Sequence, residues 1–180
     1  ASVLPILLCG CHDSKRNTAV EEINDSTTPL HLLKPDYTTP YGKLTVGQIR
    51  KDVDRVFRYI DSVTPAKVVD GEGREIADLT NLPDDAKLNQ GTYRLTSYEW
   101  AVMYMALLRA SRLLDEPRYK DYVTDRVGFL AKCAPAFAEL AVRTGKPDGQ
   151  MRQVVSPASL DDAGAMSAAF MLTAMADSTL

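Results

Sequence analysis

The chain has 180 residues, of which 45% are apolar and 25% charged, and its formal net charge is −3. This length and composition suit one domain with its own hydrophobic core. The sequence contains no block of Lys and Arg and no basic-aromatic repeat, so we expect no nucleic-acid partner.

The first residues have the character of a secretory leader. Residues 1–10 are apolar but too short to span a bilayer, and they are typical of the end of a signal peptide. The run Leu8-Cys9-Gly10-Cys11 resembles a bacterial lipobox, in which Cys11 is the lipidated first residue of the mature protein. We therefore expect a protein of the bacterial cell envelope, held on a periplasmic or outer-membrane face by a lipid on Cys11. Cys133 is then the one remaining cysteine, and its apolar surroundings predict a small core residue.

Residues 12–40 are polar, lack a sustained period and are interpreted as a tether. His12 and His31 lie in this segment, and one free cysteine remains elsewhere, so we expect no metal site and no cofactor. Residues 41–180 form the expected folded domain. Because the chain starts at Ala1 and stops directly after a helical pattern, we expect this domain to be the N-terminal part of a larger one.

Four helices are expected in this domain, and amphipathic helices alternate with almost wholly apolar ones. The Ser/Thr-x-x-acid/amide start signal occurs before three of them, at Thr45 with Gln48, Thr96 with Glu99, and Ser159 with Asp162. The expected ranges are 45–63 and 117–133 for the amphipathic helices and 96–114 and 159–176 for the apolar ones. Pro135 is expected to kink or restart the second amphipathic helix, which can run on to Val142, with Gly145 close to its C-terminal cap. The apolar helices lack a polar face: helix 96–114 should be largely buried and helix 159–176 buried on all sides. Residues 66–95 and 146–158 are predicted to be loops, with no convincing strand.

This alternation predicts an all-α fold of two hairpins, each with an outer and an inner helix, as in an α/α-toroid whose ring these residues leave incomplete. The two inner helices are then parallel, so their N-termini meet at one end together with both long loops. That end would collect Tyr98, Glu99 and Trp100 from one helix and Asp161 and Asp162 from the other. Aromatic side chains suit the faces of sugar rings, and helix N-termini suit an anionic group.

The roles of the two aspartates remain open at this level. A helix N-terminus favours the charged form of a carboxylate, which makes both residues poor proton donors and better suited to hydroxyl recognition, water orientation or electrostatic stabilisation. Successive helical residues point about 100° apart, so the two roles should differ. If Asp162 bonds back to the cap, Asp161 faces the cavity, and the reverse is also possible. The simplest alternative is that both acids, and Glu99 likewise, only cap their helices and that Trp100 only fills the core.

Three segments together resemble bacterial glycoside hydrolase families 88 and 105, the unsaturated glucuronyl and unsaturated rhamnogalacturonyl hydrolases. They are Ser97-Tyr98-Glu99-Trp100-Ala101-Val102-Met103-Tyr104, Asp115-Glu116-Pro117-Arg118-Tyr119 and Ser159-Leu160-Asp161-Asp162-Ala163-Gly164-Ala165-Met166. The resemblance covers the chain from about residue 44 to its end. Ala101 stands where the family has Gly.

The resemblance implies an (α/α)6 barrel of about twice this length that removes an unsaturated uronic acid from lyase-generated oligosaccharides, with pectin and rhamnogalacturonan favoured. It implies hydration of the C4–C5 double bond, and a catalytic Asp that corresponds to Asp161 or Asp162. The Asp that lies two residues before Gly164 matches the motif better, which favours Asp162. The family's main proton donor lies on a further inner helix, which this sequence does not include, so we expect the chain alone to be inactive.

Two other classes of protein fit the same pattern. One is a non-catalytic glycan-binding helical lipoprotein that stacks sugars on Trp100 and Tyr98. The other is a helical interaction module in which every acid is a cap.

Overall fold

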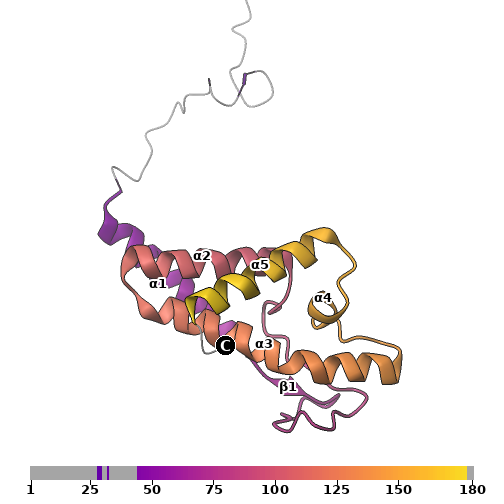
Figure 1. The fold of residues 1–180 in the computed structure, drawn as a ribbon. Coiled ribbons are helices and arrows are strands. Elements are labelled where there is room, and N and C mark those ends of the chain that lie inside the picture. Colours follow the sequence, from indigo (N-terminus) through magenta and orange to yellow (C-terminus); the bar gives the residue numbers. More distant parts are fainter. Residues whose placement is uncertain (1–27, 30–31, 33–43, 178–180) are drawn as a thin grey trace, which may run out of the picture. The chain divides into compact units, whose positions relative to one another are not determined.

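The structure, a computed structural model, describes residues 28–29, 32 and 44–177 (Figure 1). The chain divides into two units, residues 1–43 and 44–180, and the second contains all the helices described below. Cys11, His12 and His31 lie outside the described residues, as does most of the expected tether.

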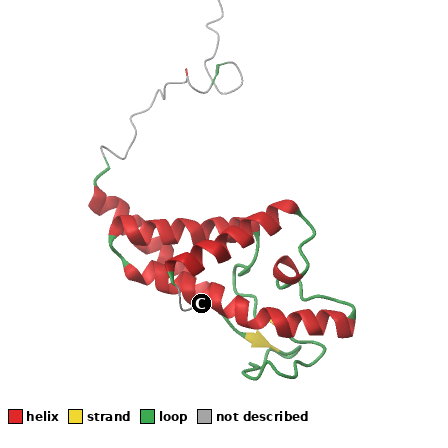
Figure 2. Ribbon diagram, in the orientation of Figure 1, coloured by secondary structure: helices red, strands yellow, loops and turns green. Residues whose placement is uncertain are grey.

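The second unit is mainly helical, as expected, with five helices and one two-stranded sheet among the described residues (Figure 2). The helices are α1 (Val46–Val63), α2 (Tyr98–Leu114), α3 (Pro117–Thr144), α4 (Arg152–Val155) and α5 (Leu160–Ala176). Helices α2 and α5 lie side by side and run in the same direction, and α3 packs against both of them in the opposite direction (Figure 1). The parallel pair of apolar helices is therefore confirmed.

The first helix begins with the predicted capping box. The Thr45 hydroxyl accepts the Gln48 N–H at 3.2 Å, and the Gln48 side chain accepts the Thr45 N–H at 2.9 Å. Its apolar stripe is only partly buried: Phe57 and Ile60 enter the core, whereas Val46 is 69% exposed. The second half of α1 is thus the part that holds it to the domain.

The start of α2 differs from the prediction by one residue. Ser97, not Thr96, is the N-cap, and its hydroxyl accepts the Trp100 N–H at 3.2 Å. Thr96 is fully buried and donates its hydroxyl to the Gln150 carbonyl at 2.7 Å. The predicted box between Thr96 and Glu99 is therefore wrong, because a tertiary hydrogen bond takes the threonine hydroxyl away from the helix.

Helix α3 runs without a break through Pro135 and ends at Gly145, which takes the left-handed conformation of the predicted C-terminal cap (φ 69°). Of the kink or restart expected at Pro135, the restart is therefore wrong, and the continuation beyond the proline is confirmed. Pro135 and Ala131, whose carbonyl loses its helical donor at the proline, both lie on the exposed face, so water can satisfy that carbonyl. Buried side chains on both sides of the proline, Cys133 and Phe137 among them, keep the two halves on one core.

The segment between α1 and α2 is more ordered than a plain loop. Strands β1 (Val68–Val69) and β2 (Lys87–Leu88) pair antiparallel, with Val68 opposite Leu88, which corrects the expectation of no strand. The return from β2 to α2 crosses the end of α1 at Gly91, where a Cβ atom would lie 2.0 Å from the Val63 carbonyl oxygen. Only glycine fits this crossing without displacing backbone.

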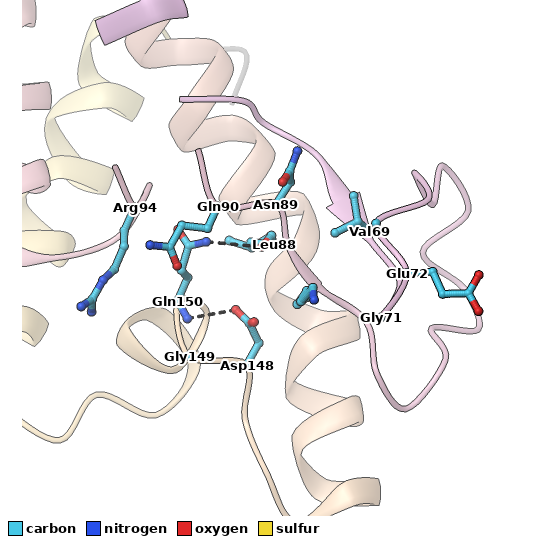
Figure 3. A pocket seen from close by; sticks show the side chains of 12 residues that line it. Val69, Gly71, Glu72, Leu88, Asn89, Gln90, Arg94, Asp148, Gly149 and Gln150 are labelled. Atoms are coloured by element: carbon cyan, nitrogen blue, oxygen red, sulfur yellow. Dashed lines mark hydrogen bonds between the residues drawn. The ribbon is translucent and has the colours of Figure 1, made fainter. Parts of the chain in front are cut away.

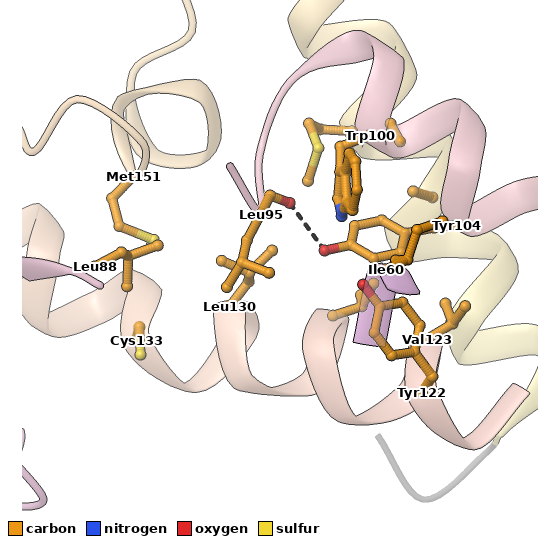
Figure 4. Close-up of a cluster of buried hydrophobic side chains, with 14 of the residues drawn as sticks. Ile60, Leu88, Leu95, Trp100, Tyr104, Tyr122, Val123, Leu130, Cys133 and Met151 are labelled. Atoms are coloured by element: carbon orange, nitrogen blue, oxygen red, sulfur yellow. Dashed lines mark hydrogen bonds between the residues drawn. The ribbon is translucent and has the colours of Figure 1, made fainter. Parts of the chain in front are cut away.

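The core lies between α1, α2, α3 and α5, and Val68, Leu88 and Met151 extend it to the strands and to the loop before α4 (Figure 4). Tyr104 is fully buried and donates its hydroxyl to the Leu95 carbonyl at 2.9 Å, which ties α2 to the segment that precedes it. Cys133 is fully buried, as predicted, and burial raises the pKa of its thiol to about 11. It therefore stays protonated and acts as a small apolar side chain.

Helix α5 is not buried on all sides, contrary to expectation. Met166, Ala169 and Thr173 are its buried residues, while Met171 is 66% and Met175 77% exposed. The described neighbours of α5 are α2, α3 and α4, and they cover one side only. Val102 of α2 is also 53% exposed.

We expect the isolated chain to self-associate through these exposed apolar side chains, since large apolar patches favour association in water. The double substitution Met171→Gln and Met175→Gln should shift the sedimentation coefficient toward that of a monomer. Val142→Gln is the matched control, because Val142 is 87% exposed but stands on α3. A monomeric unsubstituted chain at high micromolar concentration would contradict the prediction.

Candidate functional site

The N-termini of α2 and α5 meet through one carboxylate. The Tyr98 N–H, in the first turn of α2, donates to Asp162 Oδ1 at 3.2 Å. The Ser159 hydroxyl donates to Asp162 Oδ2 at 2.8 Å and accepts the Asp162 N–H at 3.1 Å. Ser159 therefore caps α5, and the Asp162 carboxylate bonds to the hydroxyl of this cap and satisfies a free N–H of the neighbouring helix.

This geometry places the two aspartates differently. Asp162 is half-buried and lines a cavity between the two helix starts, whereas Asp161 is exposed and does not line it. The expected choice between capping and facing the cavity does not hold, because a carboxylate has two oxygens with two acceptor sites each. Asp162 bonds back to the hydroxyl of the cap residue and also lines the cavity, and both of its oxygens retain acceptor capacity for a ligand hydroxyl or a water molecule.

Glu99 is exposed, lines the same cavity and stands one position too early to close a capping box with Ser97. The Ser97 hydroxyl beside it holds the pKa of the Glu99 carboxyl below its ordinary value. The negative charge of Glu99 in turn raises the pKa of the Tyr98 phenol. At neutral pH the Glu99 carboxyl is therefore ionised and accepts hydrogen bonds, while the Tyr98 phenol is protonated and can donate one.

An aromatic wall forms one side of the cavity. Trp100 is 8% exposed and stacks on Tyr93, with ring centroids 5.2 Å apart and 22° between the planes. Tyr93 is 42% exposed, so its ring extends the wall toward solvent. The indole nitrogen of Trp100 turns inward, toward the Tyr104 and Tyr122 hydroxyls, rather than into the cavity (Figure 4). Trp100 is thus both a core residue and the support of an exposed aromatic face.

The cavity has a volume of about 590 Å³, which is enough for one or two sugar units. Besides the five residues above it is lined by side chains that the sequence did not single out: Gln90, Thr92, Arg94, Ser97 and Gln153. We call this the mouth cavity. It unites Tyr98, Glu99, Trp100 and Asp162 as predicted, and it leaves out Asp161.

Two of the additional side chains are without partners. Arg94 is exposed and forms no ion pair or hydrogen bond with any described residue. Gln153, in α4, is 8% exposed, and its buried amide oxygen lacks a hydrogen-bond partner in the described part of the chain. A guanidinium and an amide oxygen at one cavity can pair with a carboxylate and a hydroxyl of a ligand, respectively.

The sequence could have pointed to Arg94 and Tyr93 as site residues. They lie shortly before the start of α2, in a loop that was expected at the same end of the domain as the N-termini of α2 and α5. Gln153 carried no such signal, because a one-turn helix inside a loop has no periodicity.

Residues 44–177 contain no group of His, Cys, Asp and Glu side chains arranged to hold a metal ion. Within the described residues, no helix is both long enough and apolar enough to cross a bilayer.

In comparisons with known proteins, no family model matches the chain and no curated protein matches it significantly.

Proposed function

We propose that the mouth cavity binds a terminal unsaturated uronic acid and that the protein hydrolyses it from oligosaccharides by hydration of the C4–C5 double bond. The observation that carries the proposal is the convergence of Asp162, Glu99, Arg94 and the stacked Tyr93–Trp100 pair on one cavity. The motifs that resemble glycoside hydrolase families 88 and 105 supply the reaction class.

Each group has a place in binding such a sugar. The exposed face of Tyr93 suits the flat, partly unsaturated ring, and stacking on Trp100 holds that face in position. The unpaired guanidinium of Arg94 can hold the uronate carboxylate in a bidentate pair. Glu99 and Asp162 can accept hydrogen bonds from ring hydroxyls, while the Tyr98 phenol can donate one.

In the proposed reaction a proton adds to C4, a water oxygen bonds to C5, and the water gives up one proton. The product is a hemiketal, which opens and releases the rest of the oligosaccharide. Asp162 orients the water and accepts its proton, since it is a hydrogen-bonded carboxylate that lines the cavity. The low pKa of Glu99 makes it unsuitable as the acid, and we assign the proton donor to a further inner helix of an (α/α)6 barrel, in line with the resemblance.

The test is the loss of ultraviolet absorbance from the conjugated double bond, measured with the full-length protein and with the products of pectin, heparin and alginate lyases. We expect turnover of at least one of these classes, and none from the 180-residue chain by itself. Absence of turnover across all three classes would refute the enzymatic proposal.

A non-catalytic glycan-binding protein is the second candidate. It is favoured by one observation: the mouth cavity offers acceptors, a cation and an aromatic face, while the lowered pKa of its Glu99 carboxyl makes that group a poor proton donor. Trp100 is the one tryptophan of the chain, so its fluorescence reports directly on occupation of this cavity. Binding of lyase products with no loss of their absorbance in the full-length protein would establish this second function instead.

A further inference from the structure

A second cavity adjoins the mouth cavity. It has a volume of about 760 Å³ and is lined by residues around the β1–β2 pair and the loop before α4: Val69, Gly71, Glu72, Gly73, Lys87, Leu88, Asn89, Asp148, Gly149 and Gln150 (Figure 3). We call this the hairpin cavity. Gln90 and Arg94 line both cavities, so the two cavities are neighbours at these two side chains.

The floor of the hairpin cavity is held by Gln150, which is 5% exposed. Its side-chain oxygen accepts the Leu95 N–H at 2.8 Å, its amide group donates to the Leu88 carbonyl at 3.4 Å, and its backbone carbonyl accepts the Thr96 hydroxyl. These bonds join β2, the segment before α2 and the loop before α4. The cavity therefore has a built floor, and its shape does not depend on a ligand.

Among the charged side chains that line this cavity, the ones without a described ion-pair or hydrogen-bond partner are both positive. Lys87 is exposed and has no ion-pair or hydrogen-bond partner among residues 44–177, as is also true of Arg94. The Asp148 carboxylate instead accepts the N–H groups of Gln150 and Met151 at 3.0 and 2.9 Å. Figure 3 shows Glu72 turned away from Gln150 and Arg94. Glu72 forms an ion pair with Arg74 at 2.9 Å. An anionic ligand therefore meets two free cations and two carboxylates that are already engaged.

We propose that the hairpin cavity holds the sugar units that follow the terminal one, and that at least one of these units is acidic. This inference rests on the proposed function of the mouth cavity and extends it from one sugar to an oligosaccharide. The chain would then enter with its unsaturated end at Asp162, pass Arg94 and Gln90, and place an acidic group near Lys87.

The test compares a disaccharide with a tetrasaccharide, by calorimetry and by Trp100 fluorescence, on the full-length protein. The probes are unsaturated di- and tetragalacturonate from pectin and the corresponding sulfated pair from heparin. We expect the tetrasaccharide of one series to bind about 10-fold tighter or more than its disaccharide. The series that shows this gain identifies the acidic group as a carboxylate or a sulfate.

Lys87→Gln should weaken tetrasaccharide binding by roughly 3- to 5-fold and leave the disaccharide unchanged, because Lys87 lines only the hairpin cavity. Lys87→Arg should restore the affinity, since it retains the charge. Lys132→Gln is the matched control: Lys132 is exposed on α3 and lines neither cavity.

The outcomes separate the two proposals. If neither disaccharide nor tetrasaccharide changes the fluorescence or releases heat, the function proposed for the mouth cavity fails. If the disaccharides bind and no tetrasaccharide binds more tightly, the mouth cavity stands and the inference about the hairpin cavity is overturned. A tetrasaccharide gain that Lys87→Gln leaves intact would also overturn it.

Discussion

Asp162→Asn is expected to lower kcat/KM of the full-length protein by about 100-fold or more, which corresponds to roughly 2.7 kcal/mol of transition-state stabilisation. The asparagine keeps the size of the side chain and one carbonyl oxygen, so one of the bonds to Tyr98 and Ser159 can persist. It cannot accept the proton of the attacking water. The same change should lower the free energy of unfolding by about 0.5–1 kcal/mol, because it weakens the cap and removes the charge at the helix start.

Asp161→Asn is the matched control for this prediction. It removes the same charge from the same first turn of α5, but Asp161 is exposed and does not line the mouth cavity. We expect kcat/KM to stay within about 2-fold of the unsubstituted value, and stability to fall by a few tenths of a kcal/mol from the lost charge–dipole interaction. Equal losses of activity in both variants would show that charge at the helix start, not the position of Asp162, governs the rate. Full activity in both would show that the pair is structural.

Gly91→Ala is expected to destabilise the domain by about 1–3 kcal/mol, the usual range for an atom forced into a packed site. The new methyl group would lie 2.0 Å from the Val63 carbonyl oxygen and 2.6 Å from Pro65 Cδ. Both neighbours are part of the backbone or of a rigid ring at the end of α1, so the segment that carries Gly91 must move instead. That segment pairs with α1 through the Thr92 N–H, which donates to the Val63 carbonyl at 3.0 Å.

The same displacement should reach the candidate site, because Gln90 and Thr92 flank Gly91, Tyr93 follows directly, and all three line the mouth cavity. We expect a lower thermal unfolding midpoint together with a shifted emission of Trp100, which loses its stacking partner Tyr93. Gly149→Ala is the control: it is the same change in another loop, but no atom lies within 4 Å of the added carbon. If Gly91→Ala left both the midpoint and the emission as they were, the tight crossing at the end of α1 would not exist.

Helix positions were largely predictable, because the interactions that define them are local. Thr45 with Gln48, Ser159 with Asp162, and Gly145 at the end of α3 act over three or four residues along the chain, and all three were read correctly. The parallel arrangement of α2 and α5 followed from the order of amphipathic and apolar helices. The barrel to which these helices are assigned stays a prediction.

Several features were decided only by the tertiary structure. The cap of α2 moved from Thr96 to Ser97 because Thr96 bonds to Gln150, which lies 54 residues away in the sequence. The extent of burial of α5 depended on which neighbours pack against it, and its apolar composition could not reveal this.

The candidate site shows the same division. The sequence by itself determined that two acidic helix starts and an aromatic segment belong to one end of the domain, because helix direction follows from chain order. Only the tertiary structure decided that Asp162 faces the cavity while Asp161 does not, and that Arg94 and Gln153 join it. One physical reason is that a single carboxylate can bond to groups of two helices at once, as Asp162 does. The other is that long-range contacts, such as those of Gln150, fix the positions of loop side chains and leave no periodic pattern in the sequence.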